Sequence, residues 1–151
     1  MKIRKILIII ILIFMFFNVF LYSEKEPPTA KISAHFLKKY INVQLKGRYF
    51  VSYLSKSDFS FRGIIQKIDN RRGYPFFIKF IDEQKEKDEE KNKYRYKFNG
   101  FPANKEKDGT IIVKIAKNII VGVGKPLKGY GDPIDILKML DIKTALDKAG
   151  K

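Results

Sequence analysis

The fold is decided by the stretch FSFRGIIQKIDNRRGYPFFIKF, residues 59–80. Its first half alternates apolar and polar side chains, which is the pattern of a strand with one buried face. The sequence NRRG at 70–73 supplies an Asn and a Gly that tolerate the positive φ of a tight turn. Pro75 lies near the start of the second half, where a missing backbone N–H does least harm to a ladder. We therefore predict a hairpin with strands at 59–69 and 74–82.

Strand-like segments continue on both sides of this hairpin. The further expected strands are 48–54, 93–101, 110–116 and 119–127. Residues 83–92, EQKEKDEEKN, have no apolar side chain and are expected to form a solvated loop or an exposed helical excursion. Residues 102–109 are expected to form a loop.

A helix is expected at each end of this domain. Residues 30–45 carry apolar side chains at three- and four-residue spacings, and this helix should end near Asn42. Residues 133–150 should form one helix that Asp132 caps, with Pro133 at its first position. The fold class is α+β, mainly β: a small barrel or a curved antiparallel sheet of about six strands, in one domain at 31–150.

An apolar segment precedes the domain at residues 6–22, ILIIIILIFMFFNVFLY, after Lys2, Arg4 and Lys5. Such a run partitions into a bilayer, and the cations before it stay in the cytoplasm, so the rest of the chain is exported. Residues 1–23 form either a cleaved signal peptide or an uncleaved signal-anchor helix, and residues 24–30 form a linker. The predicted location is extracytoplasmic or periplasmic, with the protein secreted or anchored to the inner membrane.

Several kinds of chemistry have little support in the sequence. The chain has no Cys, which excludes disulfides, zinc–thiolate sites and thiol nucleophiles. His35 is the only histidine and is expected on a helix surface. The serines near residue 55 lack a nucleophile-elbow motif, and Pro126 stands where a phosphate-binding loop needs a hydroxyl. We predict a protein without enzymatic activity, cofactor or metal.

The hairpin pattern resembles the opening of an OB-fold. A strand with a mid-strand glycine, Gly63, precedes a short turn and a second strand, and TIIVKIA and IIVGVGK stand where the last two OB strands would. Together with the leading helix, this is similar to exported OB-fold proteins of the tRNA-anti-like kind, over roughly residues 31–127. The resemblance implies an OB-like barrel and adds nucleic acid to the candidate ligands.

The formal net charge of +15 is unevenly distributed. Between residues 29 and 79, eleven Lys and Arg face only Asp58 and Asp69. This surplus either binds an anionic partner or only solvates the surface. The candidate anion-binding residues are Arg48, Arg62, Lys67, Arg71, Arg72, Arg95 and Lys97.

Aromatic residues alternate with cations at 59–62 and 94–98, and two interpretations fit. The rings stack on a ligand, as in single-strand-binding barrels, or they pack in the core while the cations face water. The two interpretations exclude each other for any one residue, because a ring inside the domain cannot stack on a ligand. We favour core packing, since an ordinary half-buried strand produces the same pattern.

These observations favour an exported or membrane-tethered binding module that contacts an anionic surface or a partner protein through its basic region. The expected partners are the membrane, through residues 6–22 if they remain, and anionic lipid, a wall polymer or an envelope protein. One alternative is a structural or assembly protein of the envelope. Another is an OB-type nucleic-acid binder, which export disfavours.

Overall fold

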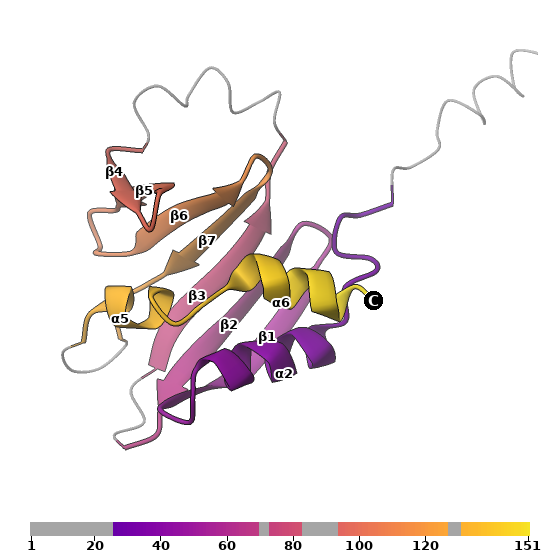
Figure 1. Cartoon of the computed structure of the whole chain (residues 1–151), viewed down its shortest axis with the longest axis horizontal. Coiled ribbons are helices and arrows are strands. Elements are labelled where there is room, and N and C mark those ends of the chain that lie inside the picture. Colours follow the sequence, from indigo (N-terminus) through magenta and orange to yellow (C-terminus); the bar gives the residue numbers. More distant parts are fainter. Residues whose placement is uncertain (1–25, 70–72, 83–93, 127–130) are drawn as a thin grey trace, which may run out of the picture.

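The computed structural model describes residues 26–69, 73–82, 94–126 and 131–151. Within these ranges the chain forms a seven-stranded antiparallel sheet and three helices, which lie on one face of the sheet (Figure 1). The strands are β1 (Tyr49–Ser57), β2 (Ser60–Lys67), β3 (Gly73–Phe80), β4 (Tyr96–Phe98), β5 (Phe101–Lys105), β6 (Ile111–Ala116) and β7 (Ile119–Val123). The helices are α2 (Ala34–Gln44), α5 (Pro133–Leu137) and α6 (Ile142–Ala149). The predictions for residues 1–23 and for Arg71 and Arg72 lie outside the described residues.

The sheet has the strand order β1-β2-β3-β7-β6-β5-β4. The predicted hairpin at 59–80 is confirmed, since β2 pairs with β3 in antiparallel register and Gly63 lies opposite Phe76. The predicted strands at 110–116 and 119–127 correspond to β6 and β7, which form a hairpin across Lys117 and Asn118, although β7 already ends at Val123. Strand β3 then pairs with β7, which joins the two parts of the sheet.

Of the two predicted architectures, the curved antiparallel sheet is confirmed and the closed barrel is wrong. In the described part of the chain, β1 and β4 are the edges of the sheet and do not pair with each other. Helix α2 supplies hydrogen-bond partners to edge strand β1. The Asn42 Oδ1 atom accepts a hydrogen bond of 2.7 Å from the Val51 N–H, and Lys38 Nζ donates one of 3.2 Å to the Ser52 carbonyl. The Val51 N–H and the Ser52 carbonyl of β1 therefore bond to side chains of α2. In a closed barrel, backbone groups of another strand would take the place of these side chains.

The single strand predicted at 93–101 is wrong, because the chain turns back within it. Strands β4 and β5 form a hairpin whose turn residues, Asn99 and Gly100, have φ values of 48° and 83°. Asn and Gly tolerate these values better than other residues, so the turn forms between Phe98 and Phe101. Part of the predicted loop at 102–109 is therefore strand β5.

The single helix predicted at 133–150 is also wrong, since it divides into α5 and α6. Asp132 caps α5 as predicted, and its Oδ1 atom accepts a hydrogen bond of 3.0 Å from the Ile134 N–H. Asp141 then caps α6, and its Oδ1 atom accepts one of 3.1 Å from the Thr144 N–H. The Gln44 side chain fixes this break by donating to the Asp141 carbonyl and accepting from the Asp141 N–H, at 2.9 and 2.8 Å.

The core lies between the sheet and the helices. The predicted N-terminal helix is confirmed as α2, which buries Leu37 and Ile41 completely and is capped by Ser33. The sheet contributes buried side chains that alternate along each strand, as in Phe61 and Ile65 of β2. In the part of the chain that is described, no helix combines the length and the apolar character needed to cross a bilayer.

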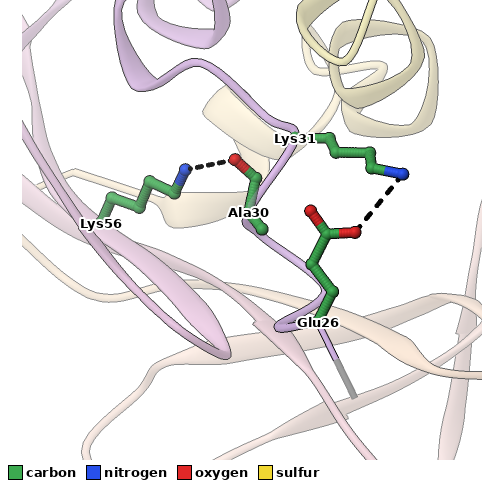
Figure 2. A network of polar contacts seen from close by, with 4 residues as sticks. All are labelled: Glu26, Ala30, Lys31 and Lys56. Carbon is green, nitrogen blue, oxygen red and sulfur yellow. Dashed lines mark hydrogen bonds and ion pairs between the residues drawn. The ribbon is translucent and has the colours of Figure 1, made fainter. Parts of the chain in front are cut away.

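The segment before α2 is fastened to the β1–β2 turn. Thr29 is 1% exposed, and its hydroxyl donates to the carbonyls of Ser57 and Asp58 at 2.6 and 3.1 Å. Lys56 Nζ donates to the Ala30 carbonyl at 3.1 Å, and Lys31 forms a 3.3 Å ion pair with Glu26 (Figure 2). The chain therefore joins the domain at the end of the sheet where β1 turns into β2.

Candidate binding surface

The face of the sheet opposite the helices is the candidate binding surface, and we call it the uncovered face. Cross-strand partners point to the same side of a sheet, so the strand register defines its members. One row runs through Ser55, Arg62, Phe77, Gly122 and Ile112. A second row, nearer the β1–β2 turn, runs through Ser57, Ser60, Lys79, Ile120 and Lys114. A third, on the other side of the first, begins with Tyr53, Ile64 and Pro75.

The charge on these three rows has one sign. Arg62 and Lys79 are exposed on adjacent strands, and Lys114 is half-buried on β6. Lys114 Nζ lies 6.0 Å from the centre of the Tyr94 ring, within range of a cation–π contact. No Asp or Glu occupies any of the described strand positions in the rows. At their described positions the three rows therefore carry cations and no carboxylate, and Asp58, in the turn between β1 and β2, lies outside them.

The centre of the uncovered face is made smooth by a ring lying over a glycine. Phe77 of β3 stands opposite Gly122 of β7, and a side chain added at Gly122 would collide with the Phe77 ring. The ring therefore occupies the space that a side chain at residue 122 would need. Tyr53 and Phe50 add exposed rings on β1. Apolar surface thus adjoins Arg62, as at sites that bind amphipathic or aromatic groups.

A shallow hollow opens at the end of the uncovered face near the β1–β2 turn. Its volume is about 610 Å³, and Phe59, Arg62, Phe77 and Lys79 contribute to its lining. The nearby serines bond to one another and to the backbone: Ser57 Oγ and Ser60 Oγ are 2.8 Å apart, and Ser57 Oγ lies 3.2 Å from the Ser60 carbonyl. Arg62 and Lys79 are thus the cations of the hollow, and Phe59 is its exposed apolar rim.

The candidate anion-binding residues predicted from the sequence do not lie together in the structure. Arg62 lies on the uncovered face, whereas Arg48 and Lys67 lie at the end of the β1–β2 pair away from the β1–β2 turn. Arg95 and Lys97 are exposed at the far edge, on or beside β4. Lys67 Nζ lies 3.1 Å from Asp69 Oδ2, and their hydrogen bond is the main reason why the pKa of Asp69 is below its ordinary value. Sequence reasoning missed Lys79 and Lys114, although each alternates with apolar residues in its strand.

Some of the aromatic residues at 59–62 and 94–98 pack in the core, and others are exposed. Phe61 is completely buried and Phe98 packs against the core, as the core interpretation predicts. Phe59 and Tyr96 are each 60% exposed and therefore offer rings to a ligand. Alternation did not distinguish these cases, because Phe59 lies in a turn and Tyr96 in a short edge strand.

Two other features lie away from the uncovered face. A cavity of about 310 Å³ lies among the β4–β5 hairpin, α5 and α6, and its apolar lining includes Phe98, Phe101, Ile115 and Leu140. His35 is exposed on α2, as expected. Within the described ranges, no three His, Asp or Glu side chains come together in a way that could hold a metal ion.

Comparison of the chain with protein-family models, with curated proteins and with solved structures found no match.

Proposed function

We propose that this protein is an exported or membrane-tethered binding module, without enzymatic activity, that holds an anionic surface or polymer on its uncovered face. The observation that carries the proposal is that Arg62 and Lys79 are exposed on adjacent strands in neighbouring rows of the uncovered face, with no carboxylate at the described positions of the three rows. The tether is the apolar segment at residues 6–22, and the extracytoplasmic location follows from the cations before it.

Electrostatic attraction and apolar contact both favour binding of an anionic ligand at the uncovered face. Cations on a surface of one sign raise the local concentration of anions and speed their association. The neighbouring rings of Tyr53 and Phe77 add apolar contact for the non-ionic part of a ligand. A contact of this kind loses affinity as ionic strength rises, because salt screens exposed charges.

The test compares two double variants with the same change in charge. Arg62→Glu with Lys79→Glu reverses the uncovered face, and Arg48→Glu with Lys97→Glu reverses two exposed cations elsewhere. We expect the first variant to elute from a heparin column at a much lower salt concentration than wild type, and the second to shift only slightly. Equal shifts would show that net charge alone governs retention and would contradict the proposal.

A second candidate function is assembly with an envelope protein. It is favoured by the apolar cavity beside the β4–β5 hairpin, where Phe101 and Tyr96 expose their rings. Binding there would resist salt and would fail in a Leu140→Lys variant. If the protein instead binds nucleic acid, as an OB-type binder would, Tyr53 and Phe50 would stack on the bases. Salt elution from a column that carries single-stranded DNA tests this alternative.

A further inference from the structure

The connection between the apolar segment and the domain is short. Tyr22 ends the apolar segment, and Glu26 is the first described residue of the domain. Four residues of extended chain span at most about 14 Å. Thr29 then holds the chain at the β1–β2 turn through its bonds to the Ser57 and Asp58 carbonyls. A bilayer that contains residues 6–22 therefore lies close to this end of the sheet.

The cations of the uncovered face gather at the same end. Ser60, Lys79, Ile120 and Lys114 form the row nearest the β1–β2 turn, and Arg62 lies in the next row. Phe59 projects from the turn with 60% of its surface exposed. The opposite end of β2 carries Arg48, Lys67 and Asp69 and lies about 23 Å away, since the seven steps from Ser60 to Lys67 rise about 3.3 Å each.

We propose that, in the full chain, Phe59, Arg62 and Lys79 dock on the anionic headgroups of the bilayer that holds residues 6–22. The inference rests on the proposed function and identifies the anionic ligand as a lipid surface. The short connection supplies a high effective concentration of headgroups, so a few cations suffice for binding. Phe59 enters the headgroup layer, and the end with Arg48 and Asp69 points away from the membrane.

The experiment uses the absence of cysteine from the chain, which makes a single introduced thiol the only labelled position. Asp58→Cys and Asp69→Cys remove the same charge from exposed positions at opposite ends of β2. Each full-length variant is labelled with an environment-sensitive fluorophore and reconstituted in phosphatidylcholine vesicles with or without phosphatidylglycerol. The vesicles carry a nitroxide quencher on their headgroups.

We expect the label at residue 58 to be quenched several-fold more than the label at residue 69, and only when phosphatidylglycerol is present. High salt, or the Arg62→Glu and Lys79→Glu background, should abolish this excess. Equal quenching at both positions, or an excess that ignores phosphatidylglycerol or the charge reversal, would overturn the docking.

The heparin experiment separates the two proposals. If quenching is equal but charge reversal still weakens heparin retention, the face binds anions and the membrane docking is refuted. If quenching is equal and retention is also unchanged, both proposals fail.

Discussion

At the scale of single residues, Asp141 is the clearest case of a side chain that shapes the fold. Its carboxylate accepts hydrogen bonds from the hydroxyl and the N–H of Thr144, at 2.7 and 3.1 Å, and these bonds lower its pKa below the ordinary 3.8. Because folding lowers the pKa of Asp141, its ionised carboxylate stabilises the folded state fully at pH values above the ordinary pKa of 3.8. The contribution is lost as the pH falls through the lower, folded-state value.

We therefore expect Asp141→Ala to lower the free energy of unfolding at pH 7 by about 1 kcal/mol, the usual cost of a lost N-cap. Asp141→Asn keeps a capping oxygen and should stay near wild type at pH 7. Urea denaturation at pH 7 and at pH 3 measures both effects, and the advantage of wild type over Asp141→Ala should shrink at pH 3. Asp147→Ala, an exposed acid on the same helix, is the matched control for charge. A pH-independent difference between wild type and Asp141→Ala would contradict the assignment.

The two caps also show what a sequence reveals at this scale. Asp132 could be predicted, because Pro133 after it marks the first position of a helix. Asp141 could not, because Leu140 and Ile142 on either side continue the apolar pattern of one long helix. The break there depends on Gln44, which is distant in the sequence and close only after folding.

At the scale of elements, the junction of β3 with β7 holds the sheet together. Phe77 covers Gly122 across this junction, and a Cβ atom at Gly122 would overlap the ring. At Gly124 a Cβ atom would meet Thr110 and Pro75 at ordinary distances of 3.5 and 3.6 Å. Both glycines are buried on the same stretch of chain, so they form a matched pair.

We expect Gly122→Ala to lower the free energy of unfolding by about 1–3 kcal/mol, the usual cost of forcing extra volume into packed structure. Gly124→Ala should change it by less than about 1 kcal/mol, because the space is adequate and the unfolded chain loses entropy. Urea denaturation measures both. In a double-mutant cycle, Phe77→Ala should remove much of the Gly122→Ala cost. Additive costs would show that the ring is not the obstacle.

Most strands could be predicted from alternation, and their pairing could not. Residues 59–69, 74–82 and 110–116 each match a strand to within a few residues. Alternation is a property of one strand, whereas the β3–β7 pairing depends on how distant segments meet. The turn at Asn99 and Gly100 was available in the sequence as a hairpin signal, and the aromatic residues on both sides obscured it.

At the scale of the whole molecule, the candidate site illustrates a similar limit. The sequence located the basic surplus at 29–79, and Arg62 of that set lies on the uncovered face. The positions of the other cations in the sheet could not be predicted from the sequence, because they depend on the order of the strands. Arg48 and Lys97 belong to opposite edges of the sheet, although both were nominated for one surface.

The helices close the core as a unit, so the domain should need its last twenty residues. A chain that ends at Gly131 lacks α5 and α6, which contribute buried Ile136, Ile142 and Leu146. We expect it to lose cooperative unfolding in urea, since the part of the core that α5 and α6 close is then open to water. Removal of Lys151 alone should leave the transition unchanged. A shortened chain that kept the wild-type midpoint would show that the sheet and α2 are sufficient.

The hydrogen bonds between Gln44 and the Asp141 backbone also affect how the chain folds during its synthesis. The two residues are 97 positions apart, and each is needed to complete the contact. A ribosome adds about 5–20 residues per second, so the partner of Gln44 is made about 5–20 seconds after Gln44 itself. During that interval the first helix has no final helix to pack against. The contact between α2 and the start of α6 therefore cannot close until residue 141 has been synthesised, and the folding of this domain is delayed until then.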